Sequence, residues 1–256
     1  AYLLEGMRRV GTWKTYHMQI KSEEFTGEGA TEEQRNSSQG GAIYTYSDNT
    51  SIGVKVENST FTGNIAAQQG GAIYQPGGSA SLNVAGSMFT GNTSTNSSGG
   101  AINTCGSNPF NVSDSTFKGN MASNGFGGAI LVEGPKAYIT DCNFGGENVA
   151  DGNSAQHGGA VRCYKSDVEI KTSKNCIFQN NTATGSGARG GAINIASNAL
   201  TVTGYTFISN SSEKTLQNYY FSYLKIYRQL QAIHLPQTKL FTAERFIQIQ
   251  RTRLQD

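Results

Sequence analysis

The tetrapeptide Gly-Gly-Ala-Ile recurs six times in this chain at nearly constant spacing. The glycine pairs begin at Gly40, Gly70, Gly99, Gly127, Gly158 and Gly190, and the fifth copy ends in Val161 where the others have Ile. The intervals between copies are 30, 29, 28, 31 and 32 residues. A period of this size, kept over many copies, is typical of stacked structural units that contact only their neighbours. The chain is therefore predicted to fold as one elongated solenoid.

A second motif, Phe-x-x-Asn, follows the same period and begins at Phe61, Phe89, Phe117, Phe178 and Phe207. Phe144 keeps the aromatic residue but has Glu147 at the third position and Asn148 one residue later, and Phe25 begins a degenerate copy. A pair of apolar residues two positions apart precedes the Phe in each unit. Because alternate residues of a strand share one face, each pair predicts a short strand with one buried face.

These spacings predict an all-β protein, a parallel β-helix of about six to seven coils over residues 25–212. Each unit is expected to supply three short strands, and neighbouring coils should lie about 4.8 Å apart. The residue after each Ile is mostly polar or amphipathic and is expected to point outward. The glycine pair is expected at a tight corner that excludes a Cβ atom.

The Asn of the second motif is expected to form a column through the turns, made of Asn64, Asn92, Asn120, Asn181 and Asn210. An Asn at the same turn of successive coils can hydrogen-bond its side-chain amide to the copies above and below. Asn also tolerates the backbone conformations of turns. The column is therefore interpreted as structural.

The combination of Gly-Gly-Ala-Ile with Phe-x-x-Asn resembles the polymorphic outer membrane protein repeat family over roughly residues 25–212. The resemblance implies a right-handed parallel β-helix displayed outside a cell, often in adhesion, and it carries over no catalytic residues. The first ten residues contain Glu5, Arg8 and Arg9 and are not expected to be a secretion signal. Similar repeats occur in eukaryotic surface proteins, so the resemblance does not fix the organism.

The composition agrees with an extracellular or cell-surface location. Charged residues make up 15% of the chain and the formal net charge is +2, a balance that argues against nucleic acid as a partner. No run of about 20 apolar residues exists, so no transmembrane segment is expected. No cofactor is expected, and no metal site either, because no cysteine pair has zinc spacing.

Eight Asn-x-Ser/Thr sequons occur in the sequence. Asn92 and Asn210 belong to the inward Asn column, where a glycan does not fit. The remaining candidates for glycosylation are Asn36, Asn49, Asn58, Asn96, Asn111 and Asn180. The alternative is that Asn and Ser are simply good turn residues.

The cysteines suggest a disulfide between coils. Cys142 and Cys176 occupy equivalent positions in successive coils, within the reach of a disulfide. Cys163 also faces the interior by its parity, so the pairs 163–176 and 142–163 compete with that pairing. Cys105 has outward parity and no clear partner. An even number of cysteines in a surface protein favours at least one disulfide, and the alternative is buried free thiols.

The repeat gives way at residues 213–256 to a basic tail without glycine. Residues 216–235 have apolar spacing close to that of a helix, Pro236 interrupts it, and residues 242–254 could form a second helix. The tail is interpreted as a cap over the open end of the solenoid, a docking arm for the next subunit, or a wrong gene model. Residues 1–24 are interpreted as a cap on the first coil.

Catalysis by a parallel β-helix would need carboxylates clustered on one outer face. The acids of the repeats are scattered, and the best candidate group consists of Asp141, Glu147 and Asp151, followed by His157 and Arg162. This group lies in the most irregular coil and has no acid at equivalent positions of neighbouring coils. The chain is therefore not expected to be an enzyme.

The sequence predicts an extracellular structural protein. The first interpretation is a subunit of a filament or surface coat that carries N-linked glycans and assembles with itself end to end or laterally. The alternative is a cell-surface adhesin segment that contacts host or cell-surface glycans, and a carbohydrate-active enzyme is the third. An adhesin predicts an exposed aromatic or loop patch on one side, whereas an enzyme predicts carboxylates that converge in a groove.

Overall fold

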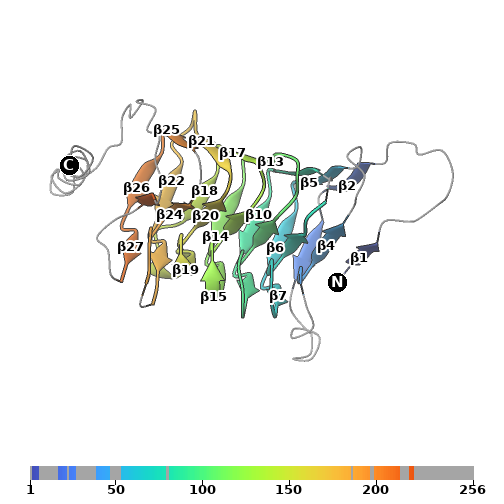
Figure 1. Cartoon of the computed structure of the whole chain (residues 1–256), viewed down its shortest axis with the longest axis horizontal. Coiled ribbons are helices and arrows are strands. Elements are labelled where there is room, and N and C mark those ends of the chain that lie inside the picture. Colours follow the sequence, from blue (N-terminus) through green and yellow to red (C-terminus); the bar gives the residue numbers. More distant parts are fainter. Residues whose placement is uncertain are drawn as a thin grey trace.

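The computed structural model describes residues 2–5, 17–21, 23–26, 39–46, 53–78, 81–185, 187–196, 199–213 and 219–221. Over these residues the chain winds into a parallel β-helix, which confirms the predicted fold class (Figure 1). Its strands form four parallel sheets that run along the rod. Five complete coils lie between Gly53 and Ala196, with a further coil described in part on each side.

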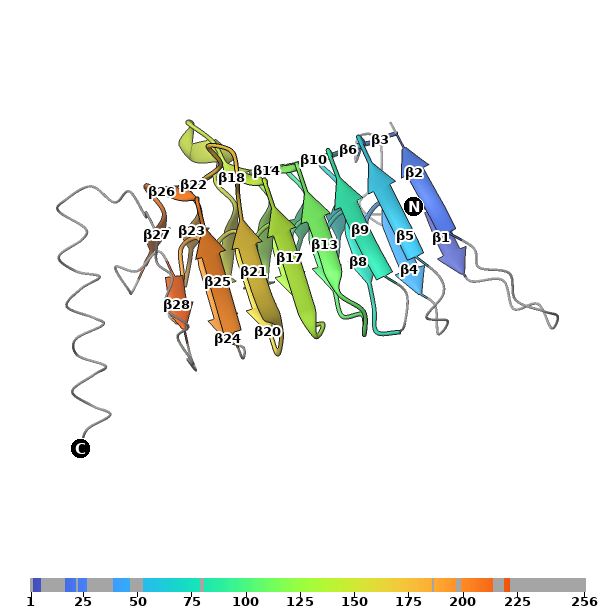
Figure 2. The ribbon, with the colours of Figure 1, turned by 90° about the horizontal axis from the view of Figure 1, so that it is seen from above.

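The four sheets are called A, B, C and D, and each complete coil passes through them in the order B, C, D, A. Sheet B holds β2 (His17–Lys21), β5 (Gly53–Glu57), β9 (Ser81–Ala85), β13 (Phe110–Ser113), β17 (Lys136–Thr140), β21 (Asp167–Lys171) and β25 (Ala199–Thr203), which lie side by side in Figure 2. Sheet C holds β3 (Glu24–Thr26), β6 (Thr60–Thr62), β10 (Met88–Thr90), β14 (Thr116–Lys118), β18 (Asn143–Gly145), β22 (Ile177–Gln179) and β26 (Thr206–Ile208). Sheet D holds β7 (Ile65–Ala66), β11 (Thr93–Ser94), β15 (Met121–Phe126), β19 (Ser154–His157), β23 (Thr182–Ala183) and β27 (Ser211–Ser212). Sheet A holds β1 (Tyr2–Glu5), β4 (Ile43–Tyr46), β8 (Ile73–Gln75), β12 (Ile102–Thr104), β16 (Ile130–Val132), β20 (Val161–Tyr164), β24 (Ile193–Ala196) and β28 (Tyr219–Phe221).

Each complete coil has four strands, whereas the repeat pattern predicted three. The additional strands form sheet D, and β7, β11 and β23 are only two residues long. A strand of two residues is too short to show the alternation by which strands are recognised in a sequence. These strands directly follow the Asn of the Phe-x-x-Asn motif, so the motif marks the corner between sheets C and D.

Side chains of one column pack against their own counterparts in the next coil. The Phe residues of the second motif form an unbroken stack of Phe25, Phe61, Phe89, Phe117, Phe144, Phe178 and Phe207, with ring centroids 4.6–5.0 Å apart and planes within 7° of parallel. The Ile residues of sheet A and the apolar pairs of sheet B fill the rest of the interior. Because burial of apolar surface is worth about 25 cal/mol per Å², this continuous core is the main source of stability.

A column of buried Asn side chains runs along the corner between sheets C and D: Asn64, Asn92, Asn120, Asn153, Asn181 and Asn210. In each step the Nδ2 of one Asn donates to the Oδ1 of the next at 2.8–2.9 Å. The same Oδ1 accepts the backbone N–H of the preceding Asn. The other Nδ2 hydrogen goes to the carbonyl oxygen of a Phe in the stack, at 2.7–3.0 Å. The four amides inside the column, those of Asn92, Asn120, Asn153 and Asn181, are thus fully paired, as a buried polar network requires.

In the coil of Phe144 the ladder uses Asn153. Asn148 is not part of the ladder, although it lies closest to the position that the Phe-x-x-Asn spacing predicts. After β18 ends at Gly145, the chain makes the 3-10 helix η1 (Val149–Asp151) before it returns to the ladder at Asn153. The side chain of Asn148 lies outside, where its Nδ2 is 3.4 Å from a carboxylate oxygen of Asp151. An insertion in a surface loop therefore displaces the ladder residue in the sequence but not in space.

The two glycines of each Gly-Gly-Ala-Ile copy have different roles at the corner between sheets D and A. Gly127 has a φ of +63°, and a Cβ there would lie 2.2 Å from the carbonyl oxygen of Ile130. A Cβ on Gly128 would lie 2.0 Å from the carbonyl oxygen of Gly159 in the next coil. The first glycine therefore permits the turn, and the second lets adjacent coils approach each other.

Strands are described in both terminal segments. β1 and β2 pair in parallel with β4 and β5, so the sheets begin before residue 25. β28 pairs in parallel with β24, so the predicted helix over residues 216–235 was wrong for Tyr219–Phe221. The predicted helix at residues 242–254 lies outside the described residues. Within the part of the chain that the structure describes, no helix is long and apolar enough to cross a membrane.

The need for glycine at the corner between sheets D and A can be measured with a matched pair of variants. Gly127→Ala is expected to lower the free energy of unfolding by more than about 3 kcal/mol, because its Cβ collides with the backbone. Gly91 has the same φ of +63° but nothing within 4 Å of a Cβ, so Gly91→Ala should cost only about 1–2 kcal/mol. Urea unfolding followed by circular dichroism measures both values, and equal losses would contradict the steric explanation.

The ladder role of Asn153 can be tested against Asn148 in the same loop. Asn153→Ala is expected to cost about 2–5 kcal/mol, because it leaves the amide of Asn120 and the carbonyl of Phe117 unpaired inside the rod. Asn148→Ala should stay within about 0.5 kcal/mol of the wild type, as exposed substitutions usually do. Calorimetric unfolding compares the two, and a similar loss in both variants would reject the ladder assignment.

Candidate functional site

The residues of the catalytic candidate lie at separate corners of the rod. Asp141 lies between sheets B and C, Asp151 belongs to η1 between sheets C and D, and His157 ends β19 next to the glycine pair. Asp151 forms an ion pair with Lys118 at 3.4 Å, and Glu147 is exposed in the same loop. No hydrogen bond or ion pair among the described residues joins Asp141 to Asp151 or to His157. The sequence neighbours of this group are thus not brought together as a site.

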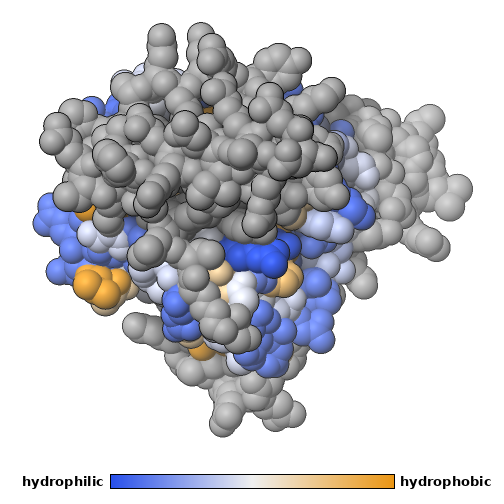
Figure 3. Space-filling model, turned by 60° about the vertical axis from the view of Figure 1, so that its left-hand side comes forward, coloured by the Kyte–Doolittle hydropathy of each residue, from blue (hydrophilic) through white to orange (hydrophobic). Residues whose placement is uncertain are grey.

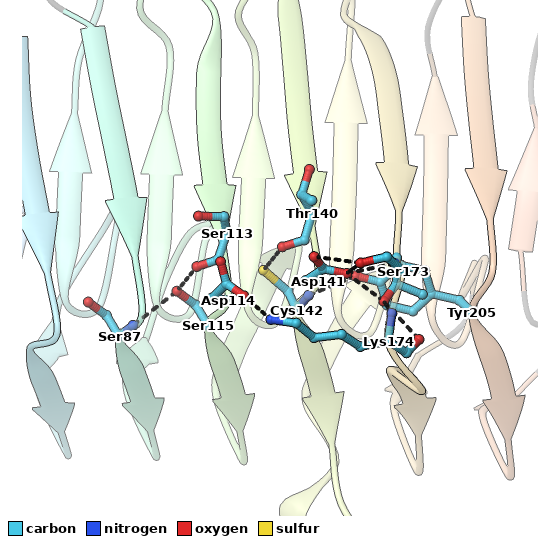
Figure 4. A network of polar contacts seen from close by, with 11 residues as sticks. Ser87, Ser113, Asp114, Ser115, Thr140, Asp141, Cys142, Ser173, Lys174 and Tyr205 are labelled. Carbon is cyan, nitrogen blue, oxygen red and sulfur yellow. Dashed lines mark hydrogen bonds and ion pairs between the residues drawn. The ribbon is translucent and has the colours of Figure 1, made fainter.

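Asp141 belongs to a polar network that links three coils at the corner between sheets B and C (Figure 4). Its Oδ1 accepts hydrogen bonds from Thr172 Oγ1 and from the backbone N–H of Ser173, both at 2.8 Å. These bonds lower the pKa of Asp141, because they stabilise the ionised form. Lys174 in the same loop forms an ion pair with Asp114, one coil further back. The network fastens an inserted loop to two earlier coils, so its role is structural.

All four cysteines are free thiols, and the predicted disulfide was wrong. Cys142 takes the place that Ser115 has one coil earlier, and its Sγ lies 3.3 Å from the carbonyl oxygen of Thr140 (Figure 4). The phenol oxygen of Tyr205 accepts the backbone N–H of Cys142 at 2.9 Å, although Tyr205 lies 63 residues further along the chain. The phenol therefore occupies the side of Cys142 that faces Cys176, where the disulfide was predicted.

Of the other two cysteines, Cys163 lies on β20 of sheet A and Cys105 directly follows β12 of the same sheet. Cys163 stands in register between Val132 and Ile195 and is fully buried, which raises the pKa of its thiol. Neither alternative pairing that involved Cys163 is formed. Cys105 is half-buried, and burial together with the nearby Glu133 carboxylate raises the pKa of Cys105 to about 12. Thiols with raised pKa values are poor nucleophiles, so these cysteines have the properties of packing residues.

The sequon asparagines differ in how available their side chains are. Asn58 and Asn96 are exposed. In contrast, the Nδ2 of Asn111 donates to its Asn counterpart in the preceding coil at 2.8 Å, and the Nδ2 of Asn180 donates to backbone carbonyls of the η1 loop. Asn36 and Asn49 lie outside the described residues. Because a glycan is attached through Nδ2, the structure favours Asn58 and Asn96 as acceptors.

Two columns of side chains flank the glycine pairs on the outside of the rod. The residues directly before the pairs form the pre-glycine column of Gln39, Gln69, Ser98, Phe126, His157 and Arg189. The residues after Ile, or after Val161, form the post-isoleucine column of Tyr44, Tyr74, Asn103, Leu131, Arg162 and Asn194. The columns contact each other: Asn103 Nδ2 lies 3.4 Å from the carbonyl oxygen of Ser98, and Arg162 Cζ lies 4.1 Å from the ring centroid of Phe126. Together the two columns are called the Gly-Gly corner.

The post-isoleucine column is more buried than its parity predicted. Its members are not part of the interior cluster, yet Tyr74, Asn103, Leu131 and Asn194 are buried. The glycine pair turns the chain so sharply that the pre-glycine side chains lie against this column. Parity shows which face of a strand a residue occupies but not what covers that face, so sequence reasoning missed the corner.

The corner is cationic in its fifth and sixth coils. The ring of His157 stacks on Phe126 at 5.1 Å, and Nη1 of Arg162 donates to Asn194 Oδ1 at 2.9 Å. Arg189 follows His157 in the pre-glycine column. Burial and the charges of Arg162 and Arg189 lower the pKa of His157 to about 4. His157 is therefore neutral at pH 7, and the positive charge belongs to the two guanidinium groups.

Unpaired polar atoms gather at the same corner. Among the described residues, four buried side-chain polar atoms have no hydrogen-bond partner, and three of them are Gln69 Oε1, His157 Nδ1 and Arg162 Nε. An unpaired buried polar atom costs about 1–3 kcal/mol. Native proteins contain few such atoms, and each one needs an explanation. Three of the four atoms thus lie along the Gly-Gly corner.

His157 is expected to make the stability of the chain depend on pH. Its pKa falls from 6.5 to about 4 on folding, so the unfolded chain binds more protons between these values. Stability is therefore lost as the pH falls through this window. His157→Phe keeps a ring against Phe126 that cannot be protonated, so its Tm should fall less than that of the wild type. Thermal unfolding between about pH 7 and pH 4 measures this difference, and parallel curves would contradict it.

The comparison with protein families agrees with this geometry. Residues 58–76 match the Chlamydia polymorphic membrane protein repeat, from the end of β5 through β6 and β7 to β8. No curated protein and no solved structure matches the chain. The match and the observed β-helix confirm the resemblance. Residues 58–76 thus carry the polymorphic membrane protein repeat, and this match is consistent with the predicted cell-surface location.

Proposed function

We propose that the chain is a structural rod of a cell surface and that it assembles with copies of itself into a filament or surface coat. The construction of the interior supports this proposal most directly. The Phe stack, the Asn ladder and the glycine corners repeat from coil to coil, so the fold yields length and stiffness and not one closed site.

The described surface suits lateral packing of such rods. The exposed large apolar side chains are Met88, Met121, Val149, Tyr164 and Ile208. Figure 3 shows a face on which most of the described residues are hydrophilic and apolar residues are isolated. With only 15% charged residues in the chain, rods can approach without strong repulsion between like charges.

Glycosylation is the second part of the proposal. A surface with few charges depends on neutral polar groups or glycans for solubility. The exposed side chains of Asn58 and Asn96 are the acceptors we propose, since the amides of Asn111 and Asn180 are engaged in hydrogen bonds. Glycans at these two positions would also limit which faces of the rods can meet.

Electron microscopy and intact-mass analysis of the native protein test both parts. We expect filaments or regular arrays of rods, together with a mass excess that Asn58→Gln and Asn96→Gln remove. Asn111→Gln is the matched control and should leave the mass excess unchanged, because its amide is held by the neighbouring coil. Dispersed monomers of unmodified mass would contradict assembly and glycosylation alike.

A second role, adhesion, is favoured by one observation. Aromatic side chains outside the interior gather on the Gly-Gly corner, where the rings of Tyr44 and Tyr74 meet edge to face at 5.6 Å and Phe126 stacks on His157. Aromatic and arginine side chains dominate the energetics of protein recognition sites. Binding of the purified rod to intact cells tests this role, and absence of binding would leave the structural role alone.

A further inference from the structure

The outer face of sheet B carries its side chains in straight columns. The strands pair in unbroken register from β5 to β21, so equivalent residues of successive coils lie side by side (Figure 2). The middle column consists of Lys55, Asn83, Asn111, Tyr138 and Glu169, and the column beside it consists of Glu57, Ala85, Ser113, Thr140 and Lys171. These side chains are exposed or half-buried, so the face is accessible along its length.

Both ends of this face carry a charged pair, and the order of the charges is reversed between them. On β5 a lysine precedes a glutamate by two residues, whereas on β21 a glutamate precedes a lysine. Lys55 pairs with Glu57 at 2.7 Å, Lys171 pairs with Glu169 at 3.0 Å, and the two lysine side chains remain 53% and 52% exposed. The columns contain no other charge between β5 and β21. Each column is therefore positive at one end and negative at the other.

This pattern is complementary to itself when two such faces meet with their rods antiparallel. A two-fold axis that runs along β13, between the faces, places each coil opposite the coil equally far on the other side of β13. Lys55 then opposes Glu169 of the second copy, and Glu57 opposes Lys171 of the second copy. Asn111 opposes its own counterpart on the axis. Each column thus meets its own complement, as an interface with two-fold symmetry requires.

The parallel arrangement of two rods does not have this property. A two-fold axis along the rod would place Lys55 opposite Lys55 of the second copy and Glu169 opposite Glu169 of the second copy. Like charges that face each other are unfavourable and select against the arrangement that contains them. The charges therefore distinguish between the two orientations.

We propose that two copies of this chain pair through the outer faces of sheet B, with their long axes antiparallel. This inference rests on the self-assembly proposed above and names the surface and the orientation that it uses. The pairing joins the sides of the rods, so the Asn ladder inside each rod is unchanged.

The shape and size of the face fit such a pair. Sheets that pack face to face lie about 10 Å apart, a gap that an extended lysine and an extended glutamate can bridge together. Between the charged ends the large side chain of Tyr138 opposes the smaller Asn83. The seven strands of sheet B cover roughly 550 Å² on each rod, or about 1,100 Å² for the pair, which is near the lower limit of specific interfaces. Pairing of two isolated rods is therefore expected to be weak and to strengthen when many rods assemble.

Carbodiimide cross-linking of the native full chain, followed by mass spectrometry, tests the inference. The reagent joins an amine directly to a carboxylate that touches it. Within one rod Lys55 and Glu169 are four coil spacings apart, about 19 Å, so a link between them must join two copies. We expect this link and the equivalent link between Glu57 and Lys171. The link between Lys55 and Glu57 within β5 is the internal control, because it forms without association.

Exchange of charges then tests the orientation. Glu169→Lys should weaken association, measured by sedimentation velocity, at least about tenfold, because it places a lysine opposite Lys55. Lys55→Glu should weaken association to a similar extent, which protects the test if one variant fails to fold. The double variant should associate within about threefold of the wild type, since opposite charges face each other again. Glu24→Lys is the matched control, because it makes the same change of charge at an exposed position of sheet C and should change Kd less than about twofold.

The outcomes separate this interface from assembly in general. Assemblies that lack the link between Lys55 and Glu169, or equal effects of Glu169→Lys and Glu24→Lys, would overturn the antiparallel pairing and leave the structural role in place. Pairs that contain the link but form no filament or array in electron micrographs would support the pairing and contradict the proposed filament or coat. Absence of association for the wild type would reject both.

Discussion

The shift of about one strand spacing, roughly 4.8 Å, that relates each coil to the next is the constraint on which this structure depends. At that distance every interior side chain contacts its own counterpart, so a residue is suitable only if it packs well against a copy of itself. Phe satisfies this by stacking, and Asn by offering a donor and an acceptor on one amide. A charged residue would face a like charge across a few ångströms of low dielectric and would be repelled. The interior columns are accordingly apolar, small or amide-bearing.

Irregularity is confined to places where this constraint does not act. The η1 loop and the loop that carries Lys174 add residues at corners, and the chain then returns to the same register in the ladder and the Phe stack. The inserted loops make polar contacts of their own, such as those between Asp141 and Ser173. Length can thus vary outside the rod while the interior stays periodic, which allows surface chemistry to change from coil to coil.

The sequence was sufficient for features that one coil repeats in the next. The glycine pairs, the Phe stack and five of the six ladder asparagines could be assigned because their spacing is nearly constant. Asn153 could not, since an insertion moves it away from Phe144, and the two-residue strands of sheet D are too short to leave a pattern. The Gly-Gly corner escaped for another reason. His157 and Arg162 are near in sequence, but their contact with Phe126 depends on how sharply the glycines turn the chain.

The Asn ladder gives the rod a direction. Each amide donates toward the coil that follows and accepts from the coil that precedes, so all the amide dipoles in the column are aligned. A column built in this way offers an acceptor at one extremity and a donor at the other. Two such columns can be joined head to tail but not head to head, because like groups would then meet. Any continuous polymer that extended this ladder would therefore be polar, with non-equivalent ends and no two-fold axis across its length.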